Sequence, residues 1–231
     1  MKYKQIFNRL PVAWEGIPYI AISLSVTVSL FILNWLLFAI LMTVLSAFTI
    51  YFFRDPDRPQ INDKAAILTP ADGKVLAIED LEQGDDRYPR GAKKISIFMS
   101  LFDAHINRIP AEGTITDLSY HPGKFFSANM DKASAHNEHN IITLDTLNKT
   151  KIVFVQIAGF IARRIACWVK EGDAVKAGQR FGLIRFGSRL EIYLPTHCTI
   201  LVKKGQKVKA GQSILGYLNE IEEEQKDEEQ K

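Results

Sequence analysis

A glycine and a serine, Gly187 and Ser188, stand between two apolar stretches near the C-terminal end, residues 181–186 and 190–194. Both stretches have the composition of β-strands, so the pair is expected in a tight turn between them. Glycine tolerates unusual backbone angles and leaves its carbonyl open to attack, and the serine hydroxyl lies next to that carbonyl. The pair could therefore cleave its own peptide bond, although a Gly-Ser turn between strands is far more often only a turn.

Two further polar residues could activate this serine. Asp72 lies in the turn 70–73, and His105 lies in the block 98–110, where a predicted strand runs into a polar loop. With histidine as the base and aspartate orienting it, the three side chains would form an Asp72–His105–Ser188 relay. Each residue also has an ordinary explanation, because Asp-Gly is a common turn pair and a single histidine is more often structural.

Composition excludes several classes of function. The chain has 231 residues and a formal net charge of only +3, which argues against nucleic acid as a partner. Its two cysteines, Cys167 and Cys198, lie in apolar surroundings without the Cys/His spacing of a metal site. We therefore expect reduced, buried thiols, a cytosolic compartment for the soluble part, and no metal.

The N-terminal quarter predicts a membrane anchor. Residues 1–17 are basic and aromatic, as at a membrane surface, and residues 18–53 contain no charged side chain. One helix through 18–53 would be about 50 Å long, well beyond a hydrocarbon core of about 30 Å. We therefore expect a helical hairpin, transmembrane or re-entrant, that breaks at Asn34 and Trp35. Basic residues at both ends place both on the cytoplasmic side of the cell (inner) membrane, whereas a single tilted span would separate them.

The remaining chain is predicted to be mainly β, of the α+β class. Short apolar runs separated by Gly, Asp and Pro turns fill residues 54–218, and an acidic, disordered tail is expected at 219–231. The segment 172–179 recurs at 205–212, which indicates two similar strand-turn-strand units about a pseudo-two-fold axis. This repeat resembles the barrel-sandwich of lipoyl- and biotinyl-type domains, but no lysine occupies the midpoint where such carriers are modified.

Six motifs in a fixed order resemble one enzyme family. They are Phe53-Arg54-Asp55-Pro56, Pro70-Ala71-Asp72-Gly73, the block 98–110, Pro122-Gly123-Lys124-Phe125, Asn137-Glu138 and Phe186-Gly187-Ser188-Arg189. Together they resemble the short, membrane-anchored form of the phosphatidylserine decarboxylase proenzyme family. The resemblance runs from about Phe52 to Tyr217, nearly the whole soluble chain.

The resemblance implies a definite chemistry. In this family the serine attacks the preceding glycine carbonyl, the chain splits, and the serine becomes an N-terminal pyruvoyl group. Here that implies fragments 1–187 and 188–231 that stay together as a heterodimer, with Asp72 and His105 activating Ser188. The pyruvoyl group would form a Schiff base with membrane phosphatidylserine and release CO2 and phosphatidylethanolamine. A homo-oligomer stays open, and no diffusible cofactor is implied.

The chain departs from the longer enzymes of the family at two positions. Those enzymes carry a second histidine three residues after the first, where this chain has Arg108, and they have Gly-Ser-Thr where it has Gly-Ser-Arg. Arg108 could hold a substrate carboxylate or phosphate bidentately. Other candidates for substrate contacts or for the missing histidine's role are His121, His136, His139, Arg163 and Arg164.

Two alternatives to this function remain at the level of sequence. One is a decarboxylase of a related lipid with an amino headgroup. The other is a membrane-tethered, lipoyl-like β-barrel module without catalysis. Self-cleavage at Gly187–Ser188 separates the enzymes from the module, and analysis of the lipid product separates the two enzymes.

Overall fold

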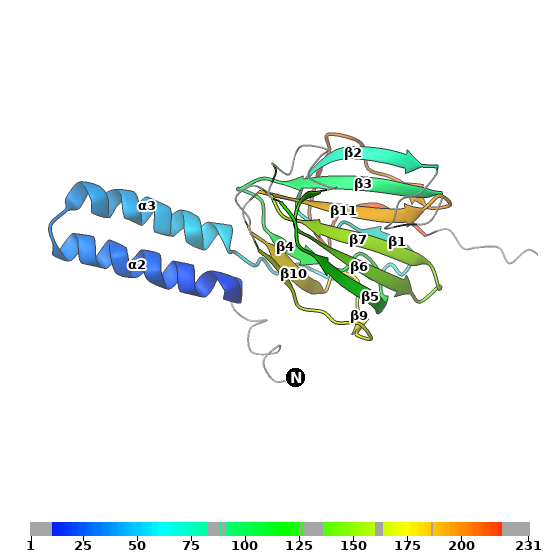
Figure 1. Ribbon diagram of the computed structural model, residues 1–231, viewed down its shortest axis with the longest axis horizontal. Coiled ribbons are helices and arrows are strands. Elements are labelled where there is room, and N and C mark those ends of the chain that lie inside the picture. Colours follow the sequence, from blue (N-terminus) through cyan, green and yellow to red (C-terminus); the bar gives the residue numbers. More distant parts are fainter. Residues whose placement is uncertain are drawn as a thin grey trace, which may run out of the picture.

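A helix pair projects from one end of a β-sheet domain in the computed structural model (Figure 1). The structure describes residues 11–82, 88, 91–124, 126, 136–159, 164–185 and 187–218. Most of the basic segment 1–17, the acidic tail 219–231, Phe125, Arg163 and Phe186 lie outside the described residues. The chain is mainly β, as predicted, and the predicted pair of helices is present.

The helix pair consists of α2 (Ile17–Ile32) and α3 (Leu36–Phe52), and α2 follows a short 3-10 turn, η1 (Trp14–Gly16). Between them the chain reverses at Asn34, whose φ of 57° is the left-handed conformation that asparagine tolerates well. Thr27 on α2 and Ser46 on α3 share a buried hydrogen bond of 3.1 Å, while the outward faces carry exposed apolar side chains. Of the described helices, Trp14–Ile32 is long and apolar enough to cross a membrane, and α3 is apolar but shorter.

An eight-stranded antiparallel sheet forms the body of the domain, and two three-stranded sheets complete it. The large sheet has the order β13 (Lys207–Val208), β2 (Gly73–Leu81), β3 (Ala92–Met99), β11 (Ser188–Pro195), β7 (Lys151–Ile157), β6 (His139–Thr146), β5 (Gly113–His121), β9 (Ala174–Val175). The small sheets are β1 (Ala66–Leu68), β14 (Ile214–Tyr217), β12 (Thr199–Ile200), and β4 (Ile106–Arg108), β10 (Arg180–Ile184), β8 (Ile165–Cys167).

Strand β11 lies in the middle of the large sheet, hydrogen-bonded to β3 on one side and β7 on the other. Its alternate residues Leu190 and Ile192 face the main core, while Tyr193 packs in a second cluster on the opposite face. Both faces of β11 are therefore buried, and its charged residues Arg189 and Glu191 are buried along with its apolar ones.

The two copies of the predicted repeat lie at opposite edges of the large sheet. Segment 172–179 contains β9, which pairs with β5, and segment 205–212 contains β13, which pairs with β2. Matching backbone bonds hold them, since the N–H of Gly172 donates to Ile115 and the N–H of Gly205 donates to Val75, both at 2.8 Å. The turns that precede β2 and β5, residues 70–73 and 110–113, also resemble each other, a second repeat that the sequence analysis missed.

The base of the helix pair packs against β4 and β10. Ala13, Phe52 and Phe53 form a buried cluster with Ile106 and Leu183, so the last turn of α3 contacts the small sheet directly. This contact fixes the surroundings of the residues that precede β4, among them His105.

Candidate active site

Ser188 is the first residue of β11, and it lies opposite Met99, the last residue of β3. Its side chain is fully buried, and its Oγ donates a long hydrogen bond of 3.9 Å to the Sδ of Met99. Gly187 before it has a φ of +59°, which side-chain-bearing residues rarely adopt, although no atom lies within 4 Å of where a Cβ would stand. The sequence therefore needs glycine here for the backbone angle and leaves open space beside the candidate scissile bond.

His105 is fully buried between β3 and β4, with its ring against Phe52 at a centroid distance of 4.2 Å. Its Nδ1 lies 3.0 Å from the carbonyl oxygen of Asp103, so this nitrogen carries the proton and donates it. The Nε2 is buried without a hydrogen-bond partner among the described residues. Burial lowers the pKa of His105 from 6.5 to about 4, against the opposing effect of Asp103. At neutral pH the ring therefore presents an unprotonated Nε2, which is the form that a general base requires.

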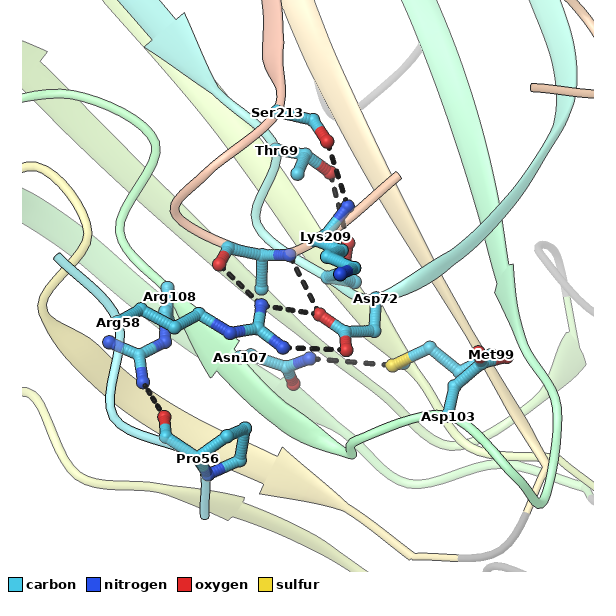
Figure 2. A network of polar contacts seen from close by, with 12 residues as sticks. Pro56, Arg58, Thr69, Asp72, Met99, Asp103, Asn107, Arg108, Lys209 and Ser213 are labelled. Atoms are coloured by element: carbon cyan, nitrogen blue, oxygen red, sulfur yellow. Dashed lines mark hydrogen bonds and ion pairs between the residues drawn. The ribbon is translucent and has the colours of Figure 1, made fainter. Parts of the chain in front are cut away.

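Asp72 is bound to Arg58 rather than to His105 (Figure 2). The two guanidinium nitrogens of Arg58 donate to its two carboxylate oxygens at 2.6 and 2.7 Å, and the backbone N–H of Ala210 donates at 2.7 Å. The negative charge of Asp72 reaches His105 only as a minor influence that raises the pKa of the histidine. In this arrangement the carbonyl of Asp103 orients the ring, and the Asp72–His105–Ser188 relay stays a prediction.

The Sδ of Met99 links β4 to the start of β11 through hydrogen bonds. Asn107, two residues after His105, donates to the Sδ of Met99 at 3.6 Å, and Ser188 donates to the same atom. The structure thus gathers Ser188, Met99 and Asn107 in one buried site, with His105 two residues away on the same chain segment.

Arg108 lines a cavity of about 680 Å³ at the base of the helix pair, together with Arg58 and Arg180. Its terminal nitrogens donate to the carbonyl oxygens of Gly178 at 3.0 Å and Pro56 at 2.8 Å. Burial, and then the neighbouring arginines, lower its pKa to about 10. The guanidinium braces the backbone in this arrangement, and its predicted contact with substrate stays a prediction.

Four of the other predicted substrate residues lie in the described part of the chain. His121 and His139 stack at 4.8 Å on β5 and β6, and His136 meets Phe126 edge-on. The cross-strand partners His139, Ile157 and Arg189 share one face of the sheet, so His139 lies on the face opposite to Ser188. Arg164 is exposed.

Motifs in the sequence did not identify four neighbours of the site, Arg58, Met99, Gln156 and Asn140. A signal existed for Gln156, because it is the one polar residue within the apolar run 152–157 and is fully buried. A polar residue at a core-facing position of a central strand needs a partner, and that partner is Asn107.

Comparison with known proteins gives the family. A family model for phosphatidylserine decarboxylase matches residues 45–216. The chain is 48% identical over 206 residues to the phosphatidylserine decarboxylase proenzyme of Syntrophus aciditrophicus (strain SB), covering 89% of this chain and 96% of that protein. The proenzyme of Desulfotalea psychrophila is 44% identical over 211 residues, covering 91% and 98%. The proenzyme of Geotalea uraniireducens is 44% identical over 208 residues, covering 90% and 97%. The chain therefore belongs to the phosphatidylserine decarboxylase family.

Proposed function

We propose that the chain converts phosphatidylserine to phosphatidylethanolamine and CO2, using a pyruvoyl group formed from Ser188. The observation that carries the proposal is a glycine with positive φ followed by a fully buried serine at the start of the central strand. Family membership supplies the reaction, since the relatives are phosphatidylserine decarboxylase proenzymes.

The maturation reaction balances with the side chains of this site. His105 Nε2 takes the hydroxyl proton as Oγ of Ser188 bonds to the carbonyl carbon of Gly187. The C–N bond then breaks, and the nitrogen takes a proton, which leaves an ester. Loss of the Cα proton of residue 188 breaks the Cβ–Oγ bond and leaves a carboxylate on Gly187. The dehydroalanine that remains tautomerises, adds water and loses ammonia to give the pyruvoyl group.

The surroundings of Ser188 fit that product. The serine Cβ becomes a methyl group, and this position lies in the core beside Met99, where a methyl group is compatible with the packing. When formed, the group supplies the carbonyl that accepts electrons as the substrate carboxylate leaves. In the uncut chain residue 188 has no exposed surface, so neighbouring side chains rather than solvent surround the serine when it attacks.

The helix pair supports a lipid surface as the location of this chemistry. Its exposed apolar side chains, including Ile32 and Leu37, suit lipid rather than water, and the cavity at its base is lined by cationic Arg108 and Lys176. We assign the pair to a hairpin in the cell inner membrane with the β domain on the cytoplasmic face. The cavity is then a candidate entrance for the anionic headgroup of the substrate.

The paired repeats support a lipoyl-like relation between the two halves of the domain. The segments 172–179 and 205–212 occupy matching places at the two sheet edges, as a pseudo-two-fold axis requires. The fragments 1–187 and 188–231 then form a heterodimer through β11, which lies between β3 and β7 of the larger fragment.

Intact-mass spectrometry of the purified chain beside Ser188→Ala tests the maturation. Wild type should give two fragments split after Gly187, the smaller one beginning with a pyruvoyl group, while Ser188→Ala stays whole. Ser119→Ala, at a serine on β5, is the matched control and should cleave normally. An uncut wild type would overturn the proposal in favour of a non-catalytic module.

Lipid analysis then identifies the reaction. The cleaved protein, incubated with vesicles that contain phosphatidylserine, should release CO2 and accumulate phosphatidylethanolamine. A cleaved protein that leaves phosphatidylserine unchanged, but decarboxylates another lipid with an amino headgroup, would support the related-lipid alternative.

A further inference from the structure

A line of buried amide side chains leads through the core to Ser188. Asn140 donates to the Oε1 of Gln156 at 3.2 Å, and Gln156 donates to the Oδ1 of Asn107 at 2.9 Å. Asn107 donates to the sulfur of Met99 at 3.6 Å (Figure 2), and the hydroxyl of Ser188 donates to the same atom. Asn107, Gln156 and Ser188 have no exposed surface at all, and Asn140 has only 2%.

The line has a direction. Each amide donates through its NH2 group in the direction of Ser188. The carbonyl oxygen of Gln156 accepts from Asn140, and that of Asn107 accepts from Gln156. Turning over Asn107 alone would set its NH2 group against the NH2 group of Gln156, so Gln156 keeps the donor of Asn107 facing the sulfur. At the far end, the Oδ1 of Asn140 has no partner among the described residues.

The sulfur is a poor final acceptor for two donors. A thioether accepts hydrogen bonds weakly, and an amide NH2 group has two protons, so Asn107 can exchange its contact with Met99 for one with an oxygen at small cost. A line of polar side chains in a core is stabilising only when it is fully satisfied, and this one ends on a weak acceptor and an unpaired oxygen. The weak acceptor, the sulfur of Met99, lies beside the proposed scissile bond.

We propose that Asn107 donates to the oxygen that becomes negatively charged when Ser188 attacks Gly187, and that Gln156 and Asn140 are positioning residues. This inference rests on the maturation proposed above. In the tetrahedral intermediate the oxyanion and the former hydroxyl oxygen are bonded to the same carbon. Because Asn107 and the hydroxyl share the sulfur of Met99, a side-chain movement that displaces the sulfur would let the NH2 group meet the oxyanion.

The other polar groups near the site are committed elsewhere. His105 presents an unprotonated nitrogen, which accepts a proton and cannot donate to an oxyanion in the same step. Arg58 is held by Asp72, and the terminal nitrogens of Arg108 bind backbone carbonyls. Among the described side chains, Asn107 is the donor whose present acceptor is weak enough to be replaced.

Substitution of Asn107 by aspartate and by leucine tests the inference. At pH 8, Asn107→Asp should slow self-cleavage about 100-fold, the usual cost of losing one oxyanion donor, because a carboxylate has no proton to give. As the pH falls to 5.5, the buried carboxyl takes up a proton and regains an O–H donor, so the cleavage rate should rise. Asn107→Leu should be equally slow at pH 8 and should not recover. Asn148→Asp, in an exposed turn, is the matched control for the added charge.

Gln156→Met tests the positioning role, because methionine keeps the volume but loses the donor. It should slow cleavage by about tenfold, and adding it to Asn107→Leu should cost nothing more, since the two residues act through one donor. Thermal unfolding of each variant in a Ser188→Ala chain shows whether the fold is kept.

Wild-type cleavage rates in folded Asn107→Asp and Asn107→Leu would overturn the inference while leaving the maturation proposal intact. An uncut wild type would instead overturn the maturation proposal itself. Equal slowing in the two variants with no recovery of Asn107→Asp at pH 5.5 would reduce Asn107 to a packing residue.

Discussion

The buried histidine should make the fold sensitive to acid in a way that one substitution can isolate. His105 lies against Phe52 with its pKa lowered from 6.5 to about 4, mainly by burial. An unfolded chain exposes the same ring with an ordinary pKa of about 6.5. At a pH between these two pKa values, the ring of the unfolded chain binds a proton that the ring of the folded chain does not. Acid therefore favours unfolding, and the stabilising effect is complete above pH 6.5 and is lost as the pH falls toward 4.

The size of the effect follows from the difference between the two pKa values. At about 1.4 kcal/mol per pKa unit, the full linkage is about 3 kcal/mol, of which about 2 to 3 kcal/mol should be lost between pH 7.5 and 4.5. The assay is urea unfolding of the detergent-solubilised, uncut Ser188→Ala chain, with and without His105→Gln. Carboxylates elsewhere titrate in both chains, so the difference between their pH dependences reports residue 105. Glutamine keeps a polar side chain of similar size and has no proton to gain.

The free energy of unfolding of the histidine chain should therefore fall by about 2 to 3 kcal/mol more than that of the glutamine chain over this range. Identical pH dependence in the two chains would refute the reasoning, because it would mean that the folded protein protonates His105 as readily as the unfolded one. Such a ring would be charged at mildly acidic pH, and it could not serve as a base there.

Three further outcomes follow from contacts elsewhere in the domain. Arg58→Gln should destabilise the uncut chain by about 3 kcal/mol, because it leaves the carboxylate of Asp72 buried without its ion-pair partner; an unchanged melting temperature would contradict this. Cys198 should react with iodoacetamide at pH 8 far more slowly than the partly exposed Cys167, since burial raises its pKa to about 11; peptide mass mapping would show the two rates, and equal labelling would contradict the burial. Thr27→Val removes the hydrogen bond between α2 and α3 and should cost only about 0.6 kcal/mol, seen as a melting temperature lower by about 2 °C; dissociation of the helix pair would contradict this.

Local patterns were enough to predict the parts of the fold that depend on local physics. The uncharged run 18–53 is too long for one span and carries Asn34 at its middle, and the structure has α2 and α3 on either side of that residue. Gly187 lies between β10 and β11 and Ser188 begins β11, close to what the apolar flanks predicted, because strand propensity and glycine's backbone freedom both act over a few residues.

The surroundings of the candidate site could not be predicted in the same way, because they depend on contacts between distant segments. Phe52 comes from the helix pair, Arg58 from the connection after it, and neither carries a local sign that it will meet His105 or Asp72. The order of strands in the large sheet is also non-local, since β11 enters between β3 and β7 late in the chain. Sequence patterns led to a predicted relay of Asp72, His105 and Ser188, but they gave no sign that the guanidinium of Arg58 would bind the carboxylate of Asp72.

The central place of β11 has a consequence for the lifetime of the protein after cleavage. The proposed cut before Ser188 would free the end of a strand whose two long edges are already hydrogen-bonded to β3 and β7, so the fragments would stay joined without a covalent link. The precursor would fold as a single molecule, whereas a cut protein, once unfolded, would have to bring two molecules together and insert one strand between two others. Unfolding would then be a one-way event, and the survival of the mature protein would depend on how slowly it opens rather than on its equilibrium stability.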